Sequence, residues 1–230
     1  ARPTMAPNKL VVTQDLFMRG GFTYKCDTVD DRVEGAYSVL DSFRSYGLVL
    51  INNASSKVTV ENLEFTRSTA WGFYKDGAGD LDIRNCRFTS NALTSNDGLY
   101  GRGLSVQGSA ASTLVSVSNC LFLGNGHLVG DGNNMGHGGG ASFVNLKGVL
   151  LDDCIFVTNG VKLVNNASPA NGGDICCGSA VYFSAVPATL RNCLFLSNHG
   201  VTRNYGSSSS KGGAIRFDNN CSGSALTNCI

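Results

Sequence analysis

The chain has 230 residues, with 18 Lys and Arg against 17 Asp and Glu and a formal net charge of +1. This balance gives no electrostatic support for binding nucleic acid or an anionic membrane, which favour clustered Lys and Arg. No stretch approaches the ~18 consecutive apolar residues that span a bilayer. Gly is frequent (29) and Pro is scarce (4), which favours many tight bends between strands whose backbone donors are used in sheets.

The cysteine content indicates the compartment. Nine cysteines are typical of an oxidising environment, so we expect an extracellular or cell-surface location. The triplets that start at Asn53 and Asn166 fit the pattern of N-glycosylation acceptors. The sequence stops partway through a repeat, at Ile230, which predicts a segment of a larger protein.

Residues 1–57 show no clear repeat. Two short apolar runs, residues 10–12 and 48–51, predict strands in irregular opening coils. Residues 58–230 form the second predicted region, of regular repeats.

A repeat begins at residue 58 and occurs six times, the last copy being incomplete. In each copy two apolar residues alternate, an Asn or Asp follows, and the alternation then resumes one position out of phase. A phase slip in a period-2 pattern predicts a bend that re-aims the strand, and Asn suits a left-handed bend. The repeats cover residues 58–65, 81–88, 115–122, 149–156, 188–195 and 224–230.

Four columns of equivalent residues follow from this alignment, and each predicts a ladder along a stack of coils. The corner column contains Asn62, Asn85, Asn119, Asp153, Asn192 and Asn228. The cysteine column contains Cys86, Cys120, Cys154, Cys193 and Cys229. The aromatic column contains Phe65, Phe88, Phe122, Phe156 and Phe195, and a second asparagine column contains Asn91, Asn125, Asn159 and Asn198.

A third strand is expected in each coil, beginning with small residues at 103–106, 140–143, 179–182 and 213–217. Successive repeats are 23 to 39 residues apart, so the excess over a compact coil must leave as loops. We place these loops at residues 126–138, 160–178 and 200–212, along one edge that could form a working surface. The predicted fold is all-β, a right-handed single-stranded parallel β-helix of the pectin-lyase-like kind. A β-sandwich or barrel would not require fixed residue types in every repeat.

Phe-x-x-Asn repeats paired with Gly-Gly-Ala-Ile, as at residues 212–215, resemble those of the chlamydial polymorphic outer membrane proteins and of related algal and protist surface proteins. The resemblance covers residues 58–230 and is looser at residues 178–181. It implies surface display, adhesion and large size, and it brings no catalytic residues.

The cysteine column has no metal-ligand spacing, so we expect its thiols to be buried as small apolar groups. Parallel in-register side chains suit bridging poorly. Outside this column, Cys26, Cys176, Cys177 and Cys221 are the disulfide candidates, with partners unassigned. The asparagine columns are interpreted as amide ladders, with calcium binding as the alternative. No cofactor is expected.

Enzymes that cleave pectin share the predicted fold and form an alternative. Gly136-His137-Gly138 and Asp152-Asp153 look like parts of a polygalacturonase signature, but in reversed order. Asp131 is the other nearby acid, and Asp153 already occupies a structural corner. Inverting hydrolysis needs two carboxylates that face each other across a sugar. Trp71, Tyr74, Tyr100 and Tyr205 are candidates for stacking on sugars.

The sequence therefore predicts a structural or adhesive module of a large extracellular or cell-surface protein, and not an enzyme. A surface filament is one assembly to which such a module could belong. Its expected partners are other segments of the same large protein or surface assembly, and glycans. A carbohydrate-binding module and a polysaccharide lyase or glycoside hydrolase remain alternatives.

Overall fold

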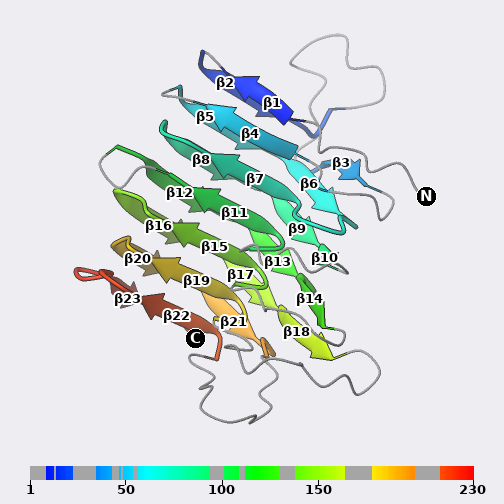
Figure 1. The fold of residues 1–230 in the computed structure, drawn as a ribbon. Helices are drawn as coiled ribbons and strands as arrows, with labels where there is room; N and C mark the ends of the chain where they lie inside the picture. Colours follow the sequence, from blue (N-terminus) through cyan, green and yellow to red (C-terminus); the bar gives the residue numbers. More distant parts are fainter. Residues whose placement is uncertain are drawn as a thin grey trace.

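The computed structural model describes residues 9–12, 14–22, 35–42, 47, 49–53, 56–93, 101–108, 112–129, 138–163, 178–199 and 213–230. In these ranges the chain forms strands and turns and no helix, and every strand pairs in parallel with the equivalent strand of the next coil. Figure 1 shows the coils stacked along one axis. No helix of the described part is long and apolar enough to cross a membrane.

The first sheet has seven strands and contains the predicted third strand of each coil. Its strands are, in order, β1 (Lys9–Val12), β4 (Val49–Asn53), β7 (Phe73–Asp76), β11 (Leu104–Gln107), β15 (Ala141–Val144), β19 (Val181–Ser184) and β22 (Ile215–Asp218).

The second sheet also has seven strands and contains the first half of each repeat. Its strands are β2 (Leu16–Arg19), β5 (Val58–Glu61), β8 (Leu81–Arg84), β12 (Leu114–Ser118), β16 (Gly148–Asp152), β20 (Ala188–Arg191) and β23 (Ala225–Thr227). Alternate residues of β5 are buried and half-buried, as expected of strands with one face in a core.

The third sheet has six strands and contains the second half of each repeat. Its strands are β3 (Ser38–Asp41), β6 (Leu63–Thr66), β9 (Arg87–Thr89), β13 (Leu121–Leu123), β17 (Ile155–Val157) and β21 (Leu194–Leu196). The three long sheets confirm the predicted all-β parallel solenoid.

A fourth, three-stranded sheet corrects the prediction of loops at residues 126 and 160. Its strands are β10 (Ala92–Leu93), β14 (Gly126–Val129) and β18 (Gly160–Leu163). A Cβ atom on Gly126 would overlap the carbonyl of Gly160, so glycine allows the coils to approach here. Gly126 and Gly160 are thus not loop residues, because the close packing of these strands requires glycine. Residues 130–137, 164–177 and 200–212 of the predicted loops lie outside the described residues.

The core lies between the three long sheets and is built from stacked columns. The rings of Phe65, Phe88, Phe122, Phe156 and Phe195 stack with centroids 4.5 to 5.2 Å apart and planes within 10° of parallel. A second stack joins Phe143, Phe183 and Phe217 in the first sheet. Aromatic stacking therefore repeats at the strand spacing along the axis.

The opening coils join the same sheets as the regular repeats. The predicted strands at residues 10–12 and 48–51 correspond to β1 and β4, which pair from Lys9↔Leu50 to Val12↔Asn53. Strands β2 and β3 were missed, because their sequences carry neither the Asn corner nor the Cys and Phe columns. β2 pairs with β5 and β3 with β6, so sheet pairing extends past the start of the sequence repeat.

Candidate functional site

The corner column joins the second sheet to the third. All six residues have left-handed backbone conformations, with φ between 50° and 55° at Asn62, Asn85, Asn119, Asp153, Asn192 and Asn228. Asn tolerates this conformation better than other non-glycine residues. The amide Nδ2 of Asn119 donates to Asn85 Oδ1 at 2.7 Å, and Asn228 Nδ2 donates to Asn192 Oδ1 at 3.2 Å. Asn62 and Asn85 are half-buried, and the other four corner residues are exposed.

The second asparagine column is an inward-facing ladder. Asn91, Asn125 and Asn159 are at most 1 % exposed. The backbone N–H and the side-chain Nδ2 of Asn125 both donate to Asn159 Oδ1, at 3.1 and 3.0 Å. Asn125 Nδ2 also donates to the carbonyl of Phe88 at 2.7 Å.

The same pair of hydrogen bonds recurs in the neighbouring coils. The backbone N–H and the Nδ2 of Asn91 donate to Asn125 Oδ1, and those of Asn159 donate to Asn198 Oδ1. At the start of the ladder the backbone N–H of Ser68 donates to Asn91 Oδ1 at 3.1 Å. The left-handed residue of this corner is the one before each Asn, for example Ser90 or Thr158. No residue type marks that position, so the sequence did not reveal it.

The cysteine column lies in the core as free thiols. Cys86, Cys120, Cys154 and Cys193 are at most 2 % exposed, and Cys229 is half-buried. Each thiol lies near the carbonyl two residues earlier, as Cys120 Sγ does to Ser118 O at 3.2 Å. Burial raises the pKa of the Cys120 thiol, whereas the hydrogen bond from the Cys154 thiol lowers the pKa of Cys193 to about 7.

Of the four disulfide candidates, the structure describes Cys221. Its thiol is free and contacts the carbonyls of Asp218 at 3.0 Å and Asn219 at 3.6 Å, because it sits inside the tight turn before β23. Cys26, Cys176 and Cys177 lie outside the described residues, as does the glycosylation candidate Asn166. Asn53 is the last residue of β4, and its side chain is not described.

Of the fragments that look like a polygalacturonase signature, the structure describes Gly138, Asp152 and Asp153. Asp152 ends β16 half-buried, and Asp153 is the exposed corner residue that follows it. Asp131 and His137 lie outside the described residues. Within the ranges that the structure covers, no group of three or more His, Cys, Asp or Glu is placed to hold a metal ion.

The aromatic candidates are partly corrected. Trp71 is 5 % exposed and forms a small buried cluster with Ala70, against which the half-buried Tyr74 packs, with the Trp71 and Tyr74 ring centroids 5.2 Å apart. The buried Trp71 ring therefore offers no open face for a sugar. Tyr100 and Tyr205 lie outside the described residues.

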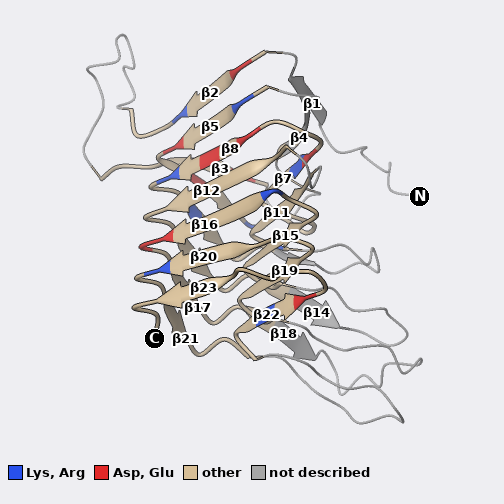
Figure 2. Ribbon diagram, turned by 90° about the vertical axis from the view of Figure 1, so that its left-hand side faces the viewer, with Lys and Arg blue, Asp and Glu red and all other residues tan. Residues whose placement is uncertain are grey.

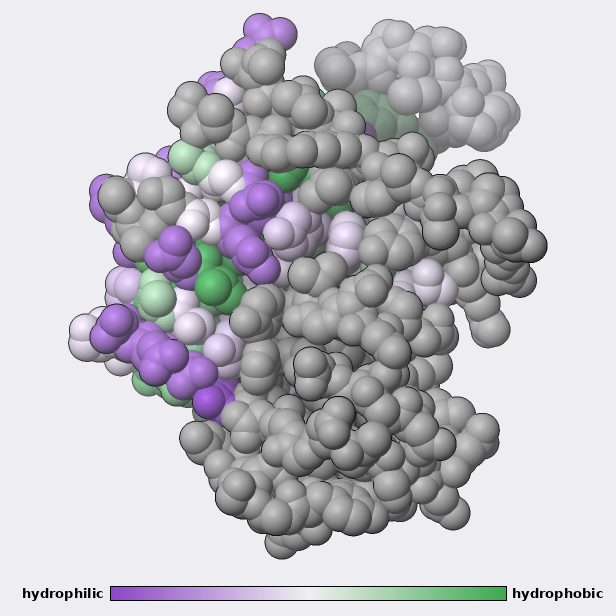
Figure 3. All heavy atoms as spheres, in the orientation of Figure 1, coloured by the Kyte–Doolittle hydropathy of each residue, from purple (hydrophilic) through white to green (hydrophobic). Residues whose placement is uncertain are grey.

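The outer face of the second sheet carries a groove that the sequence analysis missed. It has a volume of about 540 Å³, crosses the neighbouring strands β8, β12, β16 and β20, and extends to Lys57 just before β5. Figure 2 shows this sheet with its charged residues mainly at the strand ends. Among the coloured residues of the face drawn in Figure 3, hydrophilic and apolar residues are mixed.

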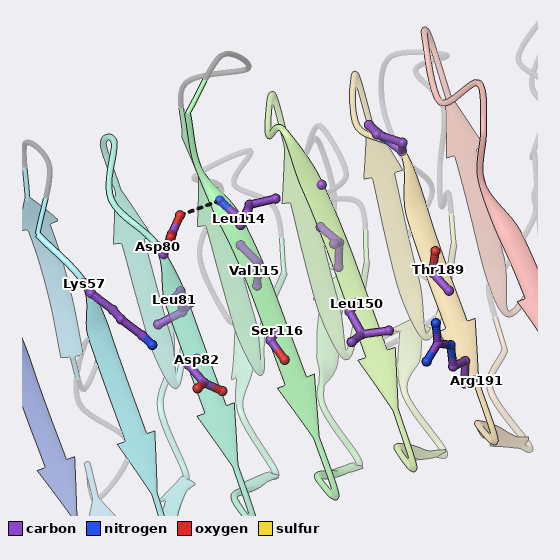
Figure 4. A pocket seen from close by; sticks show the side chains of 13 residues that line it. Lys57, Asp80, Leu81, Asp82, Leu114, Val115, Ser116, Leu150, Thr189 and Arg191 are labelled. Atoms are coloured by element: carbon purple, nitrogen blue, oxygen red, sulfur yellow. Dashed lines mark hydrogen bonds between the residues drawn. The ribbon is translucent and has the colours of Figure 1, made fainter.

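Two columns of residues line the groove. The outward column in the middle of the strands contains, in direct register, Asp82, Ser116, Leu150 and Thr189. The second column, at the strand starts, contains Lys57, Asp80, Leu114, Gly148 and Pro187. Figure 4 shows the labelled side chains spread across the strands, with Lys57 at one end and Arg191 at the other. No sequence repeat marks these positions, since their residue type changes from coil to coil.

The charged groups of the groove differ in their partners. Asp82 binds the guanidinium of Arg84 through both oxygens, which raises the pKa of Arg84. Asp80 Oδ1 accepts from the backbone N–H of Leu114 at 2.9 Å. Among the described residues, no ion pair or side-chain hydrogen bond engages the Lys57 amine or the Arg191 guanidinium. The groove therefore presents uncommitted donors at both ends.

A family model described as a right handed beta helix region matches residues 36–222. A search of curated proteins and a search of solved structures each found no match.

Proposed function

Because this chain belongs to the family of right-handed β-helix regions, we propose that it is a structural and adhesive module of a large extracellular or cell-surface protein, and not an enzyme. The observation that supports the structural part is the buried Asn91–Asn198 ladder, which ties each coil to the next through backbone and side-chain bonds. A coil bonded in this way cannot rotate against its neighbour without breaking buried hydrogen bonds.

Such a module acts as a spacer, because the solenoid grows in length with every coil. Seven strands in one sheet extend about 29 Å at a spacing of ~4.8 Å, and each further coil adds the same increment. Repeating solenoids thus make stiff spacers, and they present an extended lateral surface to partners. The expected partners are other segments of the same protein or surface assembly, and glycans.

The surface location is tested by labelling the organism that encodes the chain. Antibodies raised against the folded chain should bind intact cells as strongly as permeabilised ones. A signal that appears only after permeabilisation would contradict the proposal. An antibody to a known cytosolic protein serves as the control for membrane integrity.

A further inference from the structure

The last outward residues of the strands in the second sheet carry an alternating pattern of charge. We call these residues the end column, and they lie in direct register on neighbouring strands (Figure 2). From β2 to β20 they are Arg19, Glu61, Arg84, Ser118, Asp152 and Arg191. The signs along the solenoid axis are therefore plus, minus, plus, neutral, minus and plus, at intervals of ~4.8 Å.

The two halves of the end column differ in how their charges are paired. In the first half Arg19 donates to Glu61 at 3.0 Å, and Arg84 lies 4.0 Å from the same carboxylate. In the second half Asp152 and Arg191 are register neighbours, but they form no ion pair in the described part of the chain. Within that part, Asp152 Oδ1 is buried without a hydrogen-bond partner. The second half thus holds charges that the chain itself leaves unpaired.

The order of the signs is self-complementary about β12. A two-fold axis along β12, between two copies whose second sheets face each other, reverses the strand order of the second copy. Glu61 then lies opposite Arg191 of the second copy, and Arg84 lies opposite its Asp152. Ser118 lies on the axis, opposite its own equivalent. Because a two-fold contact occurs twice, every charge from Glu61 to Arg191 meets an opposite charge.

Neighbouring registers lose this match. An axis along β8 sets Arg84 against Arg84, and an axis along β16 sets Asp152 against Asp152. Axes midway between β12 and its neighbours set Glu61 against Asp152, or Arg84 against Arg191. With the solenoid axes parallel and the sheets in full overlap, Asp82 meets Asp82. Since facing like charges are costly at an interface, charge selects the antiparallel register about β12.

The rest of the face permits close approach about the same axis. Leu114, the first residue of β12, is 45 % exposed and packs against its own equivalent. Ser116 likewise faces Ser116. Asp82 faces Leu150 of the second copy, but it is 8 % exposed and keeps its bond to Arg84. Aligned sheets pack ~10 Å apart, a distance that the side chains of both faces fill.

The area of the face limits the strength of the contact. Seven strands of about four residues cover ~29 by ~13 Å, or roughly 400 Å² of flat sheet on each copy. Interfaces of standard size bury about 800 Å² per partner, so a weak contact is expected and its charges decide whether it forms. Weak lateral contacts become effective where many of them act together.

We propose that the outer face of the second sheet is a self-association surface, on which a second copy of this chain docks antiparallel through the charges of the end column. The proposal names a partner for the adhesive function proposed above and rests on it. The two can fail separately, because self-association is measured on the purified chain and surface display on cells.

Sedimentation velocity of the purified chain tests the association. At about 50 mM salt we expect a monomer–dimer equilibrium with a dissociation constant of about 10–100 µM. At about 500 mM salt the dissociation constant should rise about fivefold or more, because salt screens the charges. A chain that stays monomeric up to about 1 mM at the lower salt would overturn the proposal.

A charge exchange separates contacts between copies from contacts within the chain. The double variant Asp152→Arg/Arg191→Glu keeps the net charge and the opposite signs of these register neighbours, but it sets like charges opposite Arg84 and Glu61 of the second copy. Its dissociation constant should rise about tenfold or more. The matched control is Glu64→Arg/Arg87→Glu, which exchanges register neighbours on the third sheet and should associate as the wild type does.

Cross-linking locates the axis. Ser118→Cys should form a covalent dimer with a short bismaleimide matched to the ~10 Å sheet spacing. Thr89→Cys on the third sheet should give only the wild-type background from native thiols. Melting temperatures show that each variant is folded. Wild-type association by the folded double variant at residues 152 and 191, or equal yields from the two cysteine variants, would rule out this surface.

Discussion

The two asparagine columns use the same residue for different physical reasons. In the inner column Asn91, Asn125 and Asn159 are buried, and the amide of Asn125 bonds both the next coil and the preceding one. In the corner column Asn119 is exposed, has a φ of 50° and makes one side-chain bond to Asn85. The inner Asn is thus selected by its hydrogen-bonding groups, and the corner Asn by its backbone conformation.

This difference explains which substitutions each column accepts. The corner contains Asp153 in place of Asn, because Asp also tolerates a left-handed backbone. Over four coils the inner column contains only Asn at positions 91, 125, 159 and 198. A carboxylate there has no N–H groups to donate to the Phe carbonyl and the next Asn.

The largest effect is expected for Asn125→Ala. The substitution removes the acceptor of the buried Asn91 backbone N–H and the side-chain donor to the Phe88 carbonyl. It also removes one of the two hydrogen bonds of the Asn91 side-chain amide, which keeps its bond to the Phe65 carbonyl. We expect the free energy of unfolding to fall by about 3 kcal/mol or more. Urea denaturation measures this loss, with Asn119→Ala as the matched control. Equal losses in the two variants would break the distinction between the columns.

Lys75 tests the rule that inward positions are apolar or fully bonded. It is fully buried between Ile51 and Val106 of the neighbouring strands, and its amine donates to the carbonyl of Gly77 at 3.0 Å. Burial lowers its pKa from 10.5 to about 8, against the opposing influence of Asp76 and Asp80.

Lys75→Met should therefore stabilise the fold by ~2 kcal/mol at pH 7, where the wild type must bury a charged amine. Between pH 8 and 10.5 the unfolded chain holds more protons than the folded one, so wild-type stability rises with pH and the difference from Lys75→Met shrinks. Melting curves of both proteins at pH 7, 8.5 and 10 measure this. A difference that does not depend on pH would contradict the lowered pKa.

A smaller difference in stability is expected between two substitutions of the corner residue Asn119. Asn119→Val places a β-branched residue at a φ of 50° and should cost about 1–2 kcal/mol. Asn119→Gly keeps the backbone conformation and loses one exposed hydrogen bond, so it should change stability by less than about 0.5 kcal/mol. Denaturant midpoints compare them. Similar costs for Val and Gly would show that the hydrogen bond, and not the backbone, selects Asn at the corner.

The core and corner positions could be predicted from the sequence because their residue types repeat, whereas the groove on the outer surface could not because its residue types do not repeat. Asn119, Cys120 and Phe122 recur because each coil offers the same environment, so the alignment shows the corner, the core and the sheets. The groove residues Asp82, Ser116, Leu150 and Thr189 lie in one column but differ in residue type. Only the register of the strands brings them together. The fourth sheet was missed for another reason, because Gly126 and Gly160 permit close packing of strands where the sequence suggested a loop.

The most direct test of the proposal that this chain is a structural and adhesive module is a depolymerisation assay. The purified, demonstrably folded chain is incubated with acidic and neutral polysaccharides, with and without calcium, and new reducing ends and unsaturated products are followed over time. The account predicts no turnover above a heat-killed control. Turnover would contradict it and would direct mutagenesis to Asp131, His137 and Asp152.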